Sequence, residues 1–208
     1  ITRAFRITNQ GEKTIYLEKA LSGIPEDHIF VSATHNHLSP FFSSDQWEDI
    51  KDVEKTEDFV GWTWDAVERS VSAALKNCRS ASVSFGKGSC DVSINRDDIQ
   101  RPHTVIGNNP HGYSDKTVYV LKFSDGTGAP IAVLYSYAVH SSVMMGLALK
   151  DGGMLLSGDL AGFTSRYVEE AYGGDTVAFF ALGAAGNQDP KYTAGLLETG
   201  HLSPMKRE

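Results

Sequence analysis

Apolar positions recur at helical spacing in three separate parts of the chain. The clearest pattern covers residues 57–77 and predicts a long amphipathic helix. A shorter pattern over 13–22 predicts a second helix. A third helix is expected over 160–172, where Asp159 stands at the position of an N-terminal cap. Three helices are therefore expected, well separated along the chain.

Strand patterns fill most of the sequence between these helices. Residues 117–123 and 131–137 flank the turn Ser124-Asp125-Gly126-Thr127-Gly128 and predict a β-hairpin. Residues 98–114 are rich in Pro, Asn, Gly and His and predict a long loop. Other strands are expected at 1–7, 29–33, 81–86, 90–94 and 176–182. This order predicts an α/β fold, a layered sandwich of mixed β-sheets flanked by helices, with a site at the strand ends.

Length and charge narrow the classes of function. The 208 residues are enough for one hydrophobic core, so a single domain over 1–208 is expected. A formal net charge of −7 disfavours nucleic-acid partners, because phosphate contacts need a surface rich in Lys and Arg. No apolar run is long enough to span a membrane, and residues 1–10 lack a signal peptide's apolar core. A soluble, cytoplasmic protein is therefore favoured, and a homo-oligomer stays open.

Both ends of the sequence look cut. The chain opens without Met inside a strand pattern and stops after what resembles the start of a helix, so the domain is expected to be incomplete at both ends. Cys78 and Cys90 either pair or stay free. Two cysteines in a chain of this size provide neither a disulfide scaffold nor a zinc-finger pattern.

The segment Thr34-His35-Asn36-His37 carries the most informative chemistry. It follows the predicted buried strand 29–33 and sets two imidazoles two residues apart. On an extended strand, side chains at this spacing leave on the same face about 6 to 7 Å apart, which suits a shared metal ion. Such pairs also occur in ordinary loops, so the motif by itself supports either interpretation.

Polar residues follow three other predicted strands, at places where a core would not need them. Together with the histidine pair they can form one site, and glycines let backbone amides approach a ligand as an oxyanion hole requires. Each also has a structural interpretation: a core histidine, a surface ion pair or a packing turn. These residues are Asn95-Arg96-Asp97, His140, and the turn Gly183 to Pro190 with Asn187 and Asp189.

Five short motifs follow one another along the chain: Ser32 to Pro40, Ile94-Asn95-Arg96, Tyr135 to His140, Ser157-Gly158-Asp159 and Gly183 to Pro190. Over roughly residues 24–192, this series resembles the N-terminal catalytic domain of the neutral/alkaline (non-lysosomal) ceramidase family. The resemblance implies Zn2+ bound by His35 and His140, joined by His37 or Asp189. It also implies that His37 is catalytic or contacts the substrate beside the metal, and that Arg96 contacts the substrate or its developing charge.

One motif departs from the family pattern. Ceramidases of this family close the site with G-D-x-S-P, whose serine attacks the amide, whereas this chain has Gly186-Asn187-Gln188-Asp189-Pro190. Asp189 stands where the serine is expected and is predicted to act as a general base, with a cap for the turn before Pro190 as the alternative. The family's other zinc ligands, a glutamate and a tyrosine from further along, have no counterpart here. The chain resembles a divergent bacterial member.

The combined prediction is a zinc-dependent hydrolase that cleaves an amide bond of a small-molecule or lipid-like substrate. Zinc lowers the pKa of a bound water to about 7, so that hydroxide exists at neutral pH. Asn95, Gly186 and Asn187 are expected to contact the substrate, with Arg96 and the amides near Gly186 stabilising the oxyanion. An ester or a glycosidic link is an alternative target. Two other interpretations are a non-catalytic lipid- or carbohydrate-binding descendant and an inert piece of a larger enzyme.

Overall fold

The structure is a computed structural model that describes residues 2–8, 12–18, 24–25, 28, 30, 32–39, 53–100, 103–145, 147 and 155–193. The chain divides into two compact units. Unit 1 comprises Ile1–Val31 and Pro40–Arg79, and unit 2 comprises Ser32–Ser39 and Ser80–Glu208. Each unit is considered by itself, and the single domain expected over 1–208 stays a prediction.

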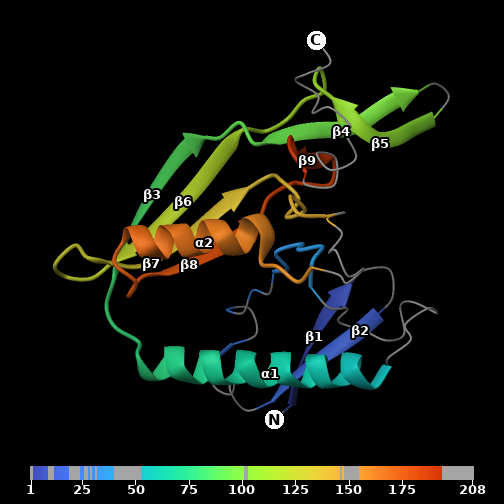
Figure 1. The fold of residues 1–208 in the computed structure, drawn as a ribbon. Coiled ribbons are helices and arrows are strands. Elements are labelled where there is room, and N and C mark those ends of the chain that lie inside the picture. The colour runs from blue at the N-terminus through green and yellow to red at the C-terminus, as the bar shows by residue number, and fades with distance from the viewer. Residues whose placement is uncertain are drawn as a thin grey trace. The chain divides into compact units, whose positions relative to one another are not determined.

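Unit 1 contains a β-hairpin and a long helix (Figure 1). Strands β1 (Thr2–Thr8) and β2 (Glu12–Glu18) pair antiparallel, with Phe5 opposite Ile15. The helix predicted over 13–22 is therefore wrong: a short helix is marginal alone, whereas the Thr14-Ile15-Tyr16 run suits a strand that β1 can pair. The long helix is confirmed as α1 (Val53–Lys76).

Unit 2 is built around a four-stranded mixed sheet in the order β3-β6-β7-β8. The expected hairpin is confirmed, because β6 and β7 pair antiparallel across a turn in which Asp125 accepts hydrogen bonds from the Thr127 and Ala129 amides. Strand β3 pairs antiparallel with β6, and β8 pairs parallel with β7. The strands are β3 (Ser82–Ser89), β6 (Thr117–Ser124), β7 (Pro130–Tyr137) and β8 (Val177–Leu182).

Helix α2 (Asp159–Ala171) lies between β7 and β8 in sequence, as a parallel pair of strands requires. It covers one face of the sheet over β7 and β8 (Figure 1). The Tyr135 and Phe180 rings contact each other there, with centroids 5.5 Å apart. The core on this face consists of Tyr135, Tyr137, Val139, Ala161, Ala178 and Phe180.

A second sheet of unit 2 has the order β5-β4-β9. Its strands are β4 (Ser93–Gln100), β5 (His103–Asn109) and β9 (Gln188–Pro190). The long loop predicted over 98–114 is therefore wrong, because β5 occupies much of it. The β-branched run Thr104-Val105-Ile106 pairs with β4, and this tertiary pairing overrides the turn-forming residues on either side.

The α/β prediction is confirmed, because unit 2 contains a helix packed on a mixed sheet and a second, three-stranded sheet. The buried strand predicted over 29–33 is wrong for the residues that the structure describes there. Phe30, Ser32 and Ala33 lie outside any strand, and Phe30 is 88% exposed.

Cys78 and Cys90 are free thiols. Within the described ranges, no helix combines the length and apolarity that crossing a membrane requires.

Candidate metal centre

Three histidine rings of unit 2 converge at one place. The ring centroids of His35 and His140 are 4.4 Å apart, those of His35 and His37 are 4.9 Å apart, and those of His37 and His140 are 5.5 Å apart. Their ligand nitrogens all lie within 4.8 Å of one another. His35 and His37 are open to solvent, whereas His140 is buried. The cluster therefore has one wall inside the protein and one side that a ligand can reach.

A turn, not an extended strand, presents His35 and His37. His35 has φ 55°, in the left-handed region, so the same-face argument for an extended strand is wrong in its geometry. Asn36 forms a parallel bridge with Ser141, and the His37 amide donates to the Ser141 carbonyl at 3.3 Å. The Asn36 side-chain amide donates to the Ser157 carbonyl at 2.6 Å. These bonds attach the histidine turn to Ser141, directly after His140, and to Ser157, just before α2.

His140 lies three residues beyond the end of β7 and is oriented by Gln188. Both the His140 amide and its ring Nδ1 lie 2.9 Å from the Gln188 carbonyl oxygen. Because a carbonyl oxygen only accepts, Nδ1 carries the proton in this arrangement and Nε2 keeps its lone pair. A backbone carbonyl on the far nitrogen is the usual way of orienting a metal-binding histidine.

Asp189 and Arg96 adjoin the histidine cluster. In the pairing of β4 with β9, Ile94 is opposite Asp189, and the Arg96 amide donates to the Asn187 carbonyl at 2.9 Å. The Asp189 Oδ1 atom lies 3.3 Å from the Arg96 guanidinium and 3.6 Å from His140 Nδ1. Both side chains are about one-quarter exposed, at 24% and 22%. Arg96 is thus ion-paired with Asp189 beside the cluster.

The surroundings favour neutral imidazoles. Partial burial among the surrounding protein atoms is the main effect that lowers the pKa of His35 from its ordinary 6.5, followed by the neighbouring His140 and His37 rings. Burial and then His140 also lower the pKa of His37, against an opposing effect of Asp189. Both rings are therefore deprotonated at neutral pH, which is the state that binds a metal ion.

Three residues predicted to contact substrate are placed differently from one another. Asn95 is 5% exposed, and its side chain donates to the Tyr113 carbonyl and accepts from the Asp97 amide, both at 2.9 Å. The Asn187 side chain accepts from Gln188 Nε2 at 2.7 Å. Gly186 is exposed, and a Cβ placed there would meet nothing within 4 Å. Asn95 is thus engaged by protein groups, while Gly186 borders open space.

Gly183 is a packing glycine in the same turn. A Cβ at this position would lie 2.9 Å from the Ala138 amide nitrogen, closer than real contacts allow. Gly183→Ala is therefore expected to lower the free energy of unfolding by about 1 to 3 kcal/mol, as overpacking does. Gly186→Ala, with open space around the new methyl, serves as the control. Urea denaturation measures both, and equal stability of the two variants would contradict this account.

Asp159 is not the N-terminal cap that its sequence position predicts: the cap of α2 is Gly158, which forms no side-chain hydrogen bond to the helix. Asp159 is the first residue of α2, has φ 46° and is 1% exposed. Its carboxylate accepts from the Val143 and Met144 amides, both at 2.9 Å. Asp159 thereby fixes the turn that follows His140. Sequence reasoning missed this role, and also the Gln188 carbonyl, because backbone partners leave no motif.

Comparisons with known proteins agree on one family. No family model matches the chain. Neutral ceramidase 1 of Arabidopsis thaliana is 28% identical over 159 residues, which cover 71% of this chain and 19% of that protein. The crystal structure of neutral ceramidase from Pseudomonas aeruginosa matches with a TM-score of 0.51 and 26% identity, covering 64% of this chain and 21% of that one.

A structure described as a ceramidase complexed with C2 also matches with a TM-score of 0.51, at 25% identity over 65% of this chain and 21% of that one. The chain thus spans about a fifth of the length of the relatives it matches. The resemblance inferred from the five sequence motifs is confirmed as a partial match. Over the matched part of its length, the chain is neutral ceramidase-like.

Proposed function

We propose that this chain carries part of the active site of a zinc-dependent hydrolase that cleaves an amide bond in a small-molecule or lipid-like substrate. The observation that carries the proposal is the convergence of His35, His37 and His140 beside Asp189. The similarity to neutral ceramidases supports the amide bond as the target. The rival interpretation, a non-catalytic binding protein, expects His35 to be paired with protein groups, whereas its ring faces two other imidazoles.

The donor set suits zinc. Imidazole nitrogen is a preferred zinc ligand, and Zn–N distances of about 2.0 to 2.1 Å place the nitrogens of a tetrahedral site about 3.3 Å apart. The ligand nitrogens here lie within 4.8 Å of one another, so small side-chain rotations close the difference. His35 and His140 would bind the ion, with His37 as a third ligand or a substrate contact. Zinc in such a site supplies a Lewis acid that lets water act as a nucleophile near neutral pH.

The neighbouring side chains have separate roles in this proposal. The Gln188 carbonyl occupies Nδ1 of His140, so Nε2 is the nitrogen left to bind the ion. Asp189 offers its carboxylate as the acceptor for a proton from the attacking water, in place of a nucleophilic serine. Arg96, adjacent to Asp189, would stabilise negative charge as it develops on the substrate oxygen. Gly186 would leave space for the substrate near the turn.

Zinc content and hydrolysis test the proposal together. The purified protein is expected to contain about one zinc ion per chain and to hydrolyse an N-acyl amide substrate, with activity lost on chelation and restored by zinc. Metal analysis and a fluorogenic N-acyl substrate measure the two properties. A protein that carries no zinc and takes up none would refute the metal site, and zinc uptake without hydrolysis would refute the catalytic role of this chain by itself.

Arg96→Lys is expected to lower kcat/KM by about 10-fold. Lysine keeps the positive charge but loses the planar fork that can contact Asp189 and a substrate oxygen together. Arg166→Lys, on the exposed side of α2 with its guanidinium over the Phe163 ring, is the matched control and is expected to leave kcat/KM unchanged. Steady-state kinetics decide, and unchanged turnover in Arg96→Lys would remove Arg96 from the site.

A further inference from the structure

A buried tyrosine hydroxyl lies at the junction of the two sheets of unit 2. Tyr137 is 5% exposed, and its hydroxyl donates to the Cys90 carbonyl at 2.6 Å. The same oxygen accepts from the Ser93 amide at 3.1 Å and lies 2.9 Å from the Ser93 hydroxyl. One side-chain atom on β7 thus makes three hydrogen bonds, and all of them reach either the first residue of β4 or Cys90, three residues before it.

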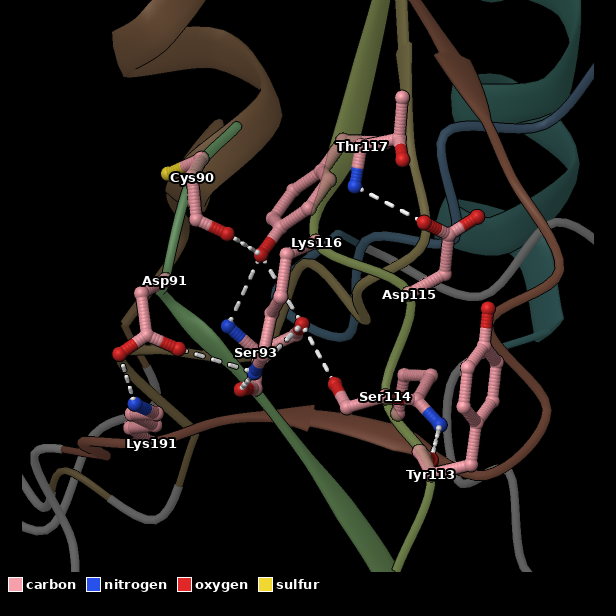
Figure 2. Close-up of polar contacts among 11 residues, drawn as sticks. Cys90, Asp91, Ser93, Tyr113, Ser114, Asp115, Lys116, Thr117 and Lys191 are labelled. Atoms are coloured by element: carbon pink, nitrogen blue, oxygen red, sulfur yellow. Dashed lines mark hydrogen bonds and ion pairs between the residues drawn. The ribbon is translucent and has the colours of Figure 1, made fainter. Parts of the chain in front are cut away.

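Ser93 and the neighbouring Asp91 extend this set of contacts to two further segments, one with Ser114 and Lys116 and one with Lys191 (Figure 2). The Ser93 side chain is fully buried, with the hydroxyl 2.9 Å from that of Ser114, and the Ser93 carbonyl accepts from Lys116 Nζ. Lys116 also pairs with Asp91 at 3.1 Å, and Asp91 in turn pairs with Lys191, which follows β9. We call the set Tyr137, Cys90, Ser93, Ser114, Lys116, Asp91 and Lys191 the Tyr137 network.

Residues of the candidate metal centre lie close in sequence to members of the Tyr137 network. Tyr137 precedes His140 by three residues on the chain, and Ser93 precedes Arg96 by three. Asp189 is opposite Ile94, directly beside Ser93 in the strand pairing, and Lys191 follows Asp189 by two residues. The network therefore sets the spacing of β7, β4 and β9 close to where His140, Arg96 and Asp189 leave them.

We propose that Tyr137 is a positioning residue for the metal centre. Its hydroxyl fixes β7 against the start of β4, and β4 in turn pairs with β9. The inference rests on the proposed function. Removing the hydroxyl would leave the buried Ser93 amide and the Cys90 carbonyl without this partner, so the strand would shift to regain hydrogen bonds. Because the Gln188 carbonyl that orients His140 lies on β9, such a shift changes the orientation of that ring.

Tyr135 provides a matched control on the same strand. It points to the same face of the sheet, is 7% exposed, and its hydroxyl contacts the Ala161 carbonyl at 3.3 Å and the Ser165 hydroxyl at 3.0 Å, both on α2. Tyr135→Phe thus removes an equally buried hydroxyl that does not reach β4 or β9. A purely structural contribution of Tyr137 would make the two phenylalanine variants behave alike.

The experiment compares Tyr137→Phe and Tyr135→Phe by zinc titration and by nitrogen NMR of the imidazoles without metal. Tyr137→Phe is expected to weaken zinc binding about 10-fold, the lower end of the range for groups that orient ligands, and to lose the single Nδ1-protonated form of His140. Tyr135→Phe is expected to keep both properties. Ser93→Ala, which removes only the hydroxyl contacts, should act in the same direction with a smaller effect and replaces Tyr137→Phe if that variant does not fold.

The two readouts separate this inference from the proposed function. Wild-type protein that binds no zinc would refute the metal site, while the His140 spectrum would still decide whether Tyr137 positions the ring. Zinc binding by wild type with equal affinity and equal His140 spectra in the two phenylalanine variants would overturn the positioning role. Equal losses in both variants, in proportion to their loss of stability, would overturn it as well.

Discussion

His140→Ala is expected to weaken zinc binding by about 100-fold or more. His140 is the buried member of the cluster, and the Gln188 carbonyl on Nδ1 leaves Nε2 free to bind the ion. Changes to groups that merely orient a ligand weaken metal binding by about 10- to 100-fold, so loss of the ligand itself should cost at least as much. Titration of zinc against a competing chelator measures the affinity of the variant and the wild type.

Two further variants make this result specific. His111→Ala removes an exposed histidine from the same unit, outside the cluster, and should leave zinc affinity unchanged. His35→Ala removes the exposed ligand on the open side of the cluster, where loss of a side chain disturbs the fold little. It should therefore reproduce the weakened binding without the stability loss that accompanies a buried substitution. Zinc affinity within about threefold of wild type in both His140→Ala and His35→Ala would contradict the site.

Local hydrophobic patterns were sufficient to predict those elements whose apolar residues have the spacing of the helix or strand that they form. The α1 stripe, the β6-β7 hairpin with its Asp125 turn and the β8 run all formed as their spacing predicts. Strands β2 and β5 were missed because pairing with a distant strand decides their structure, and a single segment does not record its partner.

The candidate site shows the same division between local and tertiary information. The motifs marked His35, His140, Arg96 and Asp189, because titratable side chains are visible in the sequence itself. The turn at His35, the Gln188 carbonyl and the Asp159 carboxylate on the Val143 and Met144 amides were not visible. These depend on backbone groups that every residue carries, so only the folded chain shows which of them meet.

Asp189→Asn is expected to slow hydrolysis by about 100-fold or more while the zinc content stays unchanged. Asparagine keeps the size of the side chain and an oxygen that can accept from Arg96, but it cannot accept a proton as a carboxylate does. The group of side chains that could hold the ion consists of three histidines and does not include Asp189, so metal content should be preserved. Single-turnover and steady-state kinetics with an N-acyl substrate, together with metal analysis, measure both properties.

Asp97→Asn is the matched control for this prediction. Asp97 lies on β4 one residue after Arg96. Its hydrogen bonds with the Asn95 and Asn109 side chains use its backbone N–H and carbonyl, which the substitution leaves in place. Turnover near the wild-type value in Asp189→Asn, with zinc retained, would leave Asp189 as a cap for the turn before Pro190. A burst of trapped acyl-enzyme in the wild type would refute direct attack by water, because a covalent intermediate requires a nucleophilic side chain. A carboxylate base in place of a nucleophilic serine requires both results together: slow hydrolysis by Asp189→Asn and no burst in the wild type.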